Sequence, residues 1–398
     1  MADLPQVIIL GAGILGLASA YHLLHRHRTL RLLVVDQLSG PGRGNTARSA
    51  AAFRDLFSSP LNRALSQGSI AFYEQVQQEI TPLGLQKLGY LWLLNGEQSQ
   101  KIQAVLDSLG VAEVAHQVLE PRQLKHLLPR LHLGDITRGL MGLNCGILNP
   151  NPLCRFYADR VQALGGKFLY HAAVTGFFRD KNGRITGVLI GDRVLTADTL
   201  VVAAGAWMSQ TLALAGLQVP VVPRKRQLFA VPAREGPLHQ LLHTPGFNPQ
   251  GMLPFTILPG GAYFRPATSS CILGYANPDQ PPGLEDRPEA EAGFFSSRIR
   301  PQVAAYFPAF RNALPGYAWA GHYADYPADS HPFVDRLEDI ILVGGTSGSG
   351  IMKADSLGRI VAGLYYGQKQ VELGQGQPFR VKDLALRGRS LTPEGMII

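Results

Sequence analysis

The stretch VIILGAGILGLASAYHLLHRHRTLRLLVVD, residues 7–36, decides the fold. It opens with an apolar run at 7–10, passes through a glycine turn at 11–16, carries apolar residues at helical spacing over 17–27, and closes with a second apolar run that ends at Asp36. Strand, glycine turn, helix and strand in this order are typical of the start of a doubly wound sheet that binds a dinucleotide. We therefore predict an α/β chain that begins with a Rossmann-like domain.

Each glycine of this turn has its own role. Gly11 permits the tight turn, Gly13 lets a pyrophosphate approach the backbone, and Gly16 lets the helix and strand pack closely. Asp36 follows 20 positions after the last glycine, where its carboxylate can accept a hydrogen bond from a ribose hydroxyl. The candidate cofactor contacts in this first segment are Gly11, Gly13, Ile14, Leu15, Gly16, Asp36 and Gln37.

Two further segments favour a flavin over a nicotinamide. Residues 40–54 are predicted as a loop that enters a helix at 50–52, with hydroxyl and guanidinium groups that can meet phosphate oxygens or a flavin edge. An ordinary helix cap with surface arginines is the alternative for that loop. In TLVVAAGAW, 199–207, small residues let the end of a strand pass close to a cofactor. The candidates here are Asn45, Thr46, Arg48, Ser49, Ala50, Val174, Ala204, Gly205 and Trp207.

A second glycine turn, GGTSGSGIMK at 344–353, lies between an apolar run at 339–345 and a predicted helix over 350–366. A helix N-terminus there offers free N–H groups and a positive dipole, and Lys353 adds a charge. A reduced flavin is negative at its pyrimidine end, so this turn suits a flavoprotein, although a purely structural turn is the alternative. The candidates are Gly345, Ser347, Gly348, Ser349, Gly350, Ile351, Met352 and Lys353.

Composition narrows the class of protein. The chain has 398 residues, 46% of them apolar and 17% charged, which predicts a globular protein of two or three domains. Its net charge of +8 is spread without a basic run, which favours attraction of small anions, or solubility alone, over nucleic-acid binding. Three cysteines predict free thiols, and the absence of a leader or a long apolar stretch predicts a cytoplasmic protein without a transmembrane segment. Histidines at 22, 25 and 27 lack accompanying ligands, so no metal site is expected.

Taken together, these segments resemble the family of FAD-dependent amine and amino-acid oxidoreductases that includes D-amino-acid oxidase, glycine oxidase, sarcosine oxidase and the FAD-dependent oxidoreductase domain-containing proteins. Further matching stretches are VPRKRQ at 222–227 and GAYFRP at 261–266, so the resemblance covers almost the whole chain. It implies an FAD-binding domain built from 1–88, 149–220 and 323–398. It also implies an α+β substrate domain, with a mixed or antiparallel sheet, built from 89–148 and 221–322.

The resemblance also implies a reaction: a hydride passes from a carbon that bears an amine to flavin N5, and water hydrolyses the imine. A carboxylate on the substrate then needs a cation, and the candidates are Arg54, Arg265 and Lys353. Strand alternation places Tyr263 on the same face as Arg265, and His322 is a candidate base. Two alternatives stay open: oxidation of a 2-hydroxy acid, and a flavin-loaded assembly protein without a small substrate. A homo- or hetero-oligomer is also left open.

The sequence departs from the sarcosine-oxidase-like pattern at two places. Where those members carry an oxygen-activating lysine, this chain has Ile272. Where they tether the flavin through a cysteine, the segment 318–332 contains none. We therefore predict non-covalent FAD and leave the electron acceptor as either oxygen or a carrier.

Overall fold

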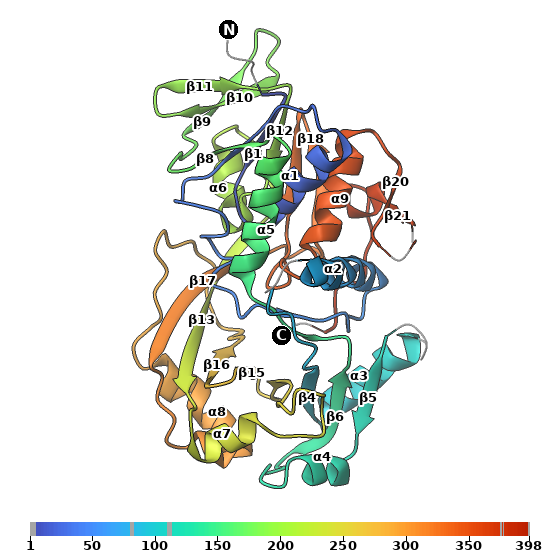
Figure 1. The fold of residues 1–398 in the computed structure, drawn as a ribbon, viewed down its shortest axis with the longest axis vertical. Coiled ribbons are helices and arrows are strands. Elements are labelled where there is room, and N and C mark those ends of the chain that lie inside the picture. Colours follow the sequence, from blue (N-terminus) through green and yellow to red (C-terminus); the bar gives the residue numbers. More distant parts are fainter. Residues whose placement is uncertain (1–4, 80–82, 110–113, 375, 377, 397–398) are drawn as a thin grey trace.

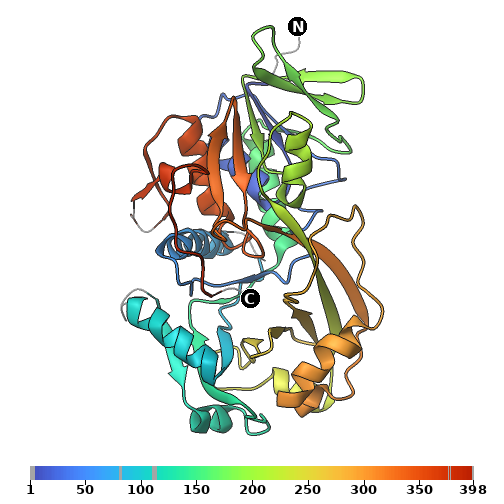
Figure 2. The same ribbon diagram turned by 180° about the vertical axis from the view of Figure 1, so that it is seen from behind.

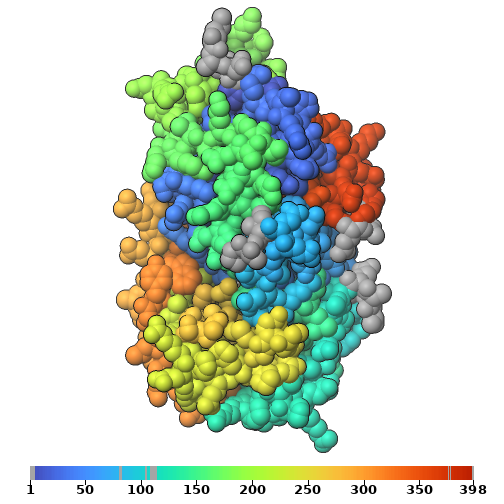
Figure 3. Space-filling view, viewed as in Figure 1, coloured from blue at the N-terminus to red at the C-terminus, as the bar shows by residue number. Residues whose placement is uncertain are grey.

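The chain folds into two bodies stacked along the long axis of the molecule, each built on one large sheet (Figure 1). The structure is a computed structural model and describes residues 5–79, 83–109, 114–374, 376 and 378–396. In the space-filling view of the same side the two bodies meet along a continuous surface (Figure 3). Among the described residues, no helix has both the length and the apolar character needed to cross a bilayer.

The upper body contains a six-stranded sheet in the order β18-β19-β12-β1-β2-β8, parallel except at β18. Val7 and Ile9 of the central strand enter one apolar cluster, and Ile8 and Leu10 enter another on the opposite face. Both faces are therefore covered, which explains why the strand is apolar throughout. The strands are β1 (Val7–Leu10), β2 (Leu32–Val35), β8 (Lys167–Leu169), β12 (Thr199–Val202), β18 (Phe333–Leu337) and β19 (Ile340–Gly344).

Helices pack closely onto one face of this sheet. A Cβ at Gly358 of α9 would lie 2.6 Å from the backbone of Ala18 of α1, so only a glycine allows these two helices to approach so closely. This face carries α1 (Ile14–Arg26), α5 (Pro150–Ala163) and α9 (Ala354–Tyr365), and α2 (Pro60–Glu79) packs against α9. On the opposite face the apolar cluster includes residues of α6 (Met208–Ala213).

The lower body contains an eight-stranded mixed sheet in the order β17-β13-β16-β15-β14-β4-β6-β5, in which only the β14–β4 pair is parallel. Tyr90 and Trp92 of β4 point to one face and Leu91 and Leu93 to the other. The strands are β4 (Tyr90–Asn95), β5 (His116–Leu119), β6 (Ile136–Gly142), β13 (Val222–Pro232), β14 (Phe255–Ile257), β15 (Ala262–Pro266), β16 (Ser270–Tyr275) and β17 (Tyr317–Asp325).

Shorter elements complete the molecule. A three-stranded sheet projects at the top end of Figure 1, and the C-terminal segment runs down to the junction between the two bodies (Figure 2). The helices of the lower body are α3 (Gly96–Leu109), α4 (Pro121–Leu127), α7 (Gly236–Leu242) and α8 (Arg300–Tyr306). The remaining strands are β3 (Ala52–Phe53), β7 (Gly146–Ile147), β9 (Gly176–Arg179), β10 (Ile185–Ile190), β11 (Arg193–Thr196), β20 (Gln370–Glu372) and β21 (Pro378–Arg380).

Two local predictions need correction. Residues 50–52 do not enter a helix: Ala51 has φ +50°, and Ala52 begins β3, which pairs with β7. This tertiary pairing overrides the helix propensity of alanine. The predicted helix over 350–366 begins only at Ala354, because the preceding residues form a turn. The amphipathic pattern over residues 60–80 also predicts a helix, and the structure has α2 there over Pro60–Glu79, while residue 80 lies outside the described residues.

The predicted division into five segments stays a proposal. The strands of the six-stranded sheet lie within 1–88, 149–220 and 323–398. Those of the eight-stranded sheet lie within 89–148 and 221–322, except for the last residues of β17. Each sheet is therefore assembled from segments far apart in the sequence.

Candidate active site

A cavity of about 550 Å³ lies at the carboxyl ends of β1 and β12, roofed by the eight-stranded sheet. β1 pairs with β2 on one side and with β12 on the other, so the chain connections diverge there. Open parallel sheets bind their ligands at such a switch point. The cavity volume is in the range of cofactor and substrate sites.

The glycine turn forms one end of the cavity. Gly11 has φ +110°, and a Cβ there would lie 2.5 Å from the carbonyl oxygen of Ala203, so this position requires glycine. A Cβ at Gly13 would meet only Thr46 Oγ1, at 3.6 Å, which leaves the space in front of α1 open. Gly16 does not line the cavity, because it packs against the carbonyl of Gly11. Of the three glycines of this turn, only Gly11 and Gly13 therefore line the cavity.

Asp36 is held in place beside this turn. Its Oδ2 accepts a hydrogen bond from the N–H of Ala12 at 2.6 Å, and its Oδ1 accepts one from Leu38 at 2.7 Å. Each carboxylate oxygen has a second lone pair that can accept a hydrogen bond from a ribose hydroxyl. An open helix N-terminus with an oriented acid beside it is the donor and acceptor set that FAD requires, so these residues fit the cofactor.

The loop that contains Asn45 connects the two bodies. Asn45 Oδ1 accepts a hydrogen bond from the N–H of His322 at 2.9 Å, and Trp319 Nε1 donates to the carbonyl of Arg48 at 2.9 Å. Both partners lie on β17, so the roof sheet fixes the position of this loop over the cavity.

Most of the predicted cofactor residues line this one cavity, although their role as ligands stays a prediction. Gly345 does not, because it packs against the ring of Phe333. The predicted cofactor residues that line the cavity are Gly11, Gly13, Ile14, Leu15, Asp36, Gln37, Asn45, Thr46, Arg48, Ser49, Ala50, Val174, Ala204, Gly205, Trp207, Ser347, Gly348, Ser349, Gly350, Ile351, Met352 and Lys353.

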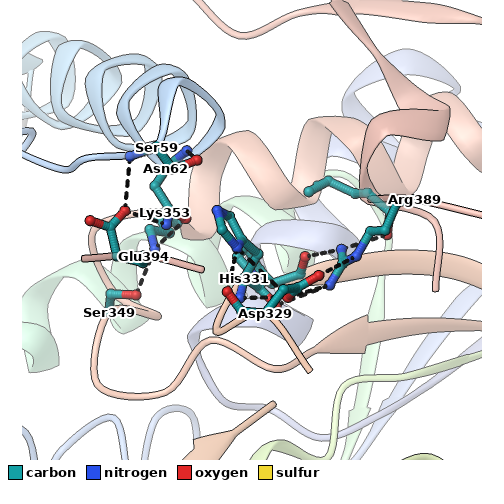
Figure 4. A network of polar contacts seen from close by, with 10 residues as sticks. Ser59, Asn62, Asp329, His331, Ser349, Lys353, Arg389 and Glu394 are labelled. Atoms are coloured by element: carbon teal, nitrogen blue, oxygen red, sulfur yellow. Dashed lines mark hydrogen bonds and ion pairs between the residues drawn. The ribbon is translucent and has the colours of Figure 1, made fainter. Parts of the chain in front are cut away.

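Arg54 and Lys353 are both buried at the cavity wall. The terminal nitrogens of Arg54 donate to the carbonyls of Leu56 and Met396, and its guanidinium lies 3.9 Å from the ring centre of Phe57. Lys353 Nζ donates to Asn62 Oδ1 and to Ser349 Oγ, each at 2.8 Å (Figure 4).

Burial, followed by the positive charge of Arg54, lowers the pKa of Lys353 to about 7. The ammonium can therefore lose its proton near neutral pH.

Aromatic residues of the roof sheet line the other wall. Tyr90 stacks on Phe255 with ring centres 4.3 Å apart, and burial raises the pKa values of Tyr263 and Tyr323, so their hydroxyls stay protonated. Arg226 lies over the Tyr323 ring at 5.0 Å, and its Nε is buried without a hydrogen-bond partner among the described residues. This compartment combines flat apolar surfaces with hydrogen-bond donors, which suits a small polar organic substrate.

The family model for FAD-dependent oxidoreductases, DAO, matches residues 6–364. The chain belongs to the DAO family. It is therefore an FAD-dependent oxidoreductase, with FAD as its cofactor. Human peroxisomal sarcosine oxidase is 26% identical over 90% of this chain and 91% of that protein. FAD-dependent oxidoreductase domain-containing protein 1 of Xenopus laevis is 26% identical over 91% of this chain and 80% of that protein. L-proline dehydrogenase from P. horikoshii superimposes with a TM-score of 0.78 at 23% identity, over 92% and 95% of the two chains.

Arg265 does not reach the cavity of this DAO-family protein, which corrects its predicted place there. It shares a sheet face with Tyr263, as the alternation predicted, but it lines a second cavity beyond the loop of Ser49. Its register partner Ile272 lines that second cavity too. Two residues advance a strand by about 6.6 Å, which is enough to carry the guanidinium past the loop.

His322 lines the cavity beside Asn45 and Trp207, two of the predicted cofactor residues. Its Nε2 already accepts a hydrogen bond from the N–H of Glu285 at 3.1 Å, and burial lowers its pKa. This geometry gives no support to the predicted role of His322 as a base.

Several cavity residues were missed by the sequence reasoning. Arg226 lies in the stretch VPRKRQ, and its alternation with Leu228 could have placed it on the cavity face. Nothing in the local sequence signals Glu394, which reaches the cavity from the C-terminal segment. No cluster of metal-ligating side chains occurs in the part of the chain that the structure describes.

Proposed function

We propose that this DAO-family protein oxidises the C–N bond of a small amino or imino acid, or of another secondary amine. Bound FAD supplies an N5 that accepts the hydride, and water then hydrolyses the imine. The observation that carries the proposal is one continuous cavity. It extends from the glycine turn and Asp36 to a compartment lined by Tyr90, Tyr263 and Tyr323, with buried cations in its wall.

The side chains of this compartment have separable roles. The tyrosine rings and Phe255 exclude water from the reacting carbon, and the protonated tyrosine hydroxyls can donate to a polar group of the substrate. Arg226 and Lys353 supply positive charge for a carboxylate. An amine that binds in its neutral form needs no strong base, which agrees with the engaged Nε2 of His322. Sarcosine and L-proline, which give two of the relatives their names, are small amines with one carboxylate, and they support this substrate class.

The electron acceptor is either oxygen or a carrier. Ile272, at the position of the lysine that sarcosine-oxidase-like members carry, lines the second cavity and gives no charge to the first. We propose that FAD is held without a covalent bond, because no cysteine lines the cavity within the described residues. All three cysteines are buried and unpaired, which supports our proposal of a reducing, cytoplasmic compartment.

The test is anaerobic reduction of the flavin. The protein is saturated with FAD and mixed without oxygen with glycine, sarcosine, L-proline, iminodiacetate and glycolate, and the visible absorption band is followed. Bleaching by an amine is expected, and reoxidation by air or only by a dye then identifies the acceptor. Bleaching by glycolate alone would replace the proposal with hydroxy-acid oxidation. A stable oxidised band with every compound, together with co-purification of a larger partner, would favour an assembly role.

A further inference from the structure

The C-terminal strap, residues 385–396, is clamped to the wall of the cavity. Arg389 Nη2 donates to Asp329 Oδ1 at 3.0 Å, and its Nη1 donates to the carbonyl of Pro332 at 2.7 Å (Figure 4). At its far end, Arg54 donates to the carbonyl of Met396. The strap is thus held on both sides of Glu394, whose side chain lines the cavity.

Glu394 is buried and its carboxylate is fully hydrogen-bonded. Ser58 donates from its N–H at 2.7 Å and from its Oγ at 2.6 Å, Ser59 N–H donates at 3.2 Å, and Met396 N–H donates at 3.0 Å. Asn62 Nδ2 completes the set at 2.9 Å. Burial alone would raise the pKa of Glu394, but the hydrogen bonds from Ser58 and Asn62 and the charge of Arg54 lower it to about 2. The group is therefore an anion across the physiological pH range.

Asn62 joins this anion to Lys353. Its Nδ2 donates to Glu394 Oε2 at 2.9 Å, while its Oδ1 accepts from Lys353 Nζ at 2.8 Å. A carboxylate can only accept, so Glu394 requires the amide nitrogen on its own side. The amide oxygen is then turned toward the ammonium.

The charges around Lys353 are unbalanced without Glu394. Arg54 is a second buried cation, and the buried His331 ring is close enough to interact electrostatically with Lys353. The negative charge of Glu394 opposes these positive charges. The Phe57 ring, whose centre lies 4.5 Å from Lys353 Nζ, offers the ammonium only a weaker contact with its aromatic face. Two buried cations without an anion would drive the proton off the lysine.

We propose that Glu394 is the positioning residue of Lys353: it orients the Asn62 amide and supplies the negative charge that keeps the ammonium protonated to hold a substrate carboxylate. The carboxylate part rests on the proposed function. Glu394 lies beyond residues 6–364, the range matched by the family model, so this contribution comes from outside the matched range.

The direct test follows the Lys353 side chain without any substrate. The FAD-saturated protein is labelled with ¹³Cε-lysine, and the lysine signals are titrated by NMR, with Lys353→Met identifying the Lys353 resonance. We expect a midpoint near 7 in the wild type. In Glu394→Gln we expect it to fall by about one pH unit or more, because an opposite charge has been removed. Glu394→Asp retains the charge and should stay near the wild-type midpoint. Glu372→Gln, an equal charge change at an exposed residue of β20, should leave it unchanged.

A functional readout accompanies the titration. Acetate binding, measured from the perturbation of the visible flavin band, should weaken as pH rises through the Lys353 midpoint. In Glu394→Gln this weakening should occur at a lower pH than in the wild type. One unit of midpoint corresponds to about tenfold weaker binding at pH values above both midpoints. Asn62→Ala, which keeps the Glu394 charge but removes the acceptor, should also lower the midpoint.

The outcomes separate the two proposals. An unchanged Lys353 midpoint in Glu394→Gln would overturn the inference whatever acetate does. If Glu394→Gln fails to fold, an unchanged midpoint in Asn62→Ala would overturn it. If the midpoint falls as expected but the wild type binds no acetate at any pH, the role of Glu394 toward Lys353 stands and the carboxylate substrate class fails.

Discussion

Gly13→Ala separates cofactor binding from folding, and it tests the placement of the cofactor most directly. The backbone at Gly13 has φ −72° and ψ 176°, which alanine adopts freely, and the new Cβ would meet only Thr46 Oγ1 at 3.6 Å. Because Gly13 is the N-cap of α1, where alanine is less favourable than glycine, the variant without cofactor should lose only about 0.5–1 kcal/mol. The methyl group does, however, take the space through which a pyrophosphate approaches α1.

The expected size of the effect follows from binding linkage. If the methyl group weakens FAD about 100-fold, a concentration that stabilises the wild type by about 2.7 kcal/mol will stabilise Gly13→Ala by only about 0.4 kcal/mol. An unfolding entropy of about 2.1 cal/mol/K per residue gives a chain of 398 residues about 1.2 °C of melting temperature per kcal/mol, so the wild type should gain roughly 3 °C on addition of FAD and the variant about 0.5 °C. Thermal melts with and without FAD, and equilibrium dialysis for the affinity, measure both quantities.

Gly11→Ala is the matched contrast. Its φ of +110° and a Cβ at 2.5 Å from the carbonyl oxygen of Ala203 strain the fold itself, so this variant should melt lower even without cofactor. Wild-type FAD affinity in Gly13→Ala would refute the reasoning, because the pyrophosphate could not then lie in front of α1.

Three further predictions concern the same cavity. The folded pKa of Glu394, about 2, lies below its ordinary 4.5, so its contribution is present above pH 4.5 and is lost as pH falls toward 2. Of a total contribution of roughly 3 kcal/mol, about 2 kcal/mol is lost between pH 7 and pH 3, so over this range the free energy of urea unfolding should fall less in Glu394→Gln than in the wild type by about that amount. Equal pH dependence in both proteins would contradict this. Acid precipitation should release all FAD into the supernatant, whereas yellow colour in the washed pellet would indicate a covalent bond. Arg226→Gln should raise KM for a carboxylate-bearing amine about tenfold or more at nearly constant kcat, while exposed Arg234→Gln should not; equal KM values would remove Arg226 from substrate binding.

The glycine turns were predictable because their requirements are local. The turn needs a positive φ at Gly11, free space at Gly13 and a fixed spacing to Asp36. These requirements involve residues close together in the sequence, and no other residue types meet them as well as glycine and an acid do. Lys353 could be predicted in the same way, because it directly follows the second glycine turn before a helical pattern.

Strand alternation predicted faces but not lateral positions. It placed Tyr263 and Arg265 on one face, yet only the packing of the loop at Ser49 decides that one lines the main cavity and the other the second cavity. The same limit explains the missed Arg226, whose neighbour Tyr323 comes from a different strand. A period of two specifies a direction and says nothing about what lies opposite.

By itself, then, the sequence determined the doubly wound opening, the cofactor class and about half of the residues that line the cavity, because steric demands at a turn act within a few residues. Only the tertiary structure brought Glu394 to Asn62, which is 332 positions away in the chain. The charge state of Lys353 depends on that approach, because burial and the sum of nearby charges are properties of three-dimensional packing that no local pattern records.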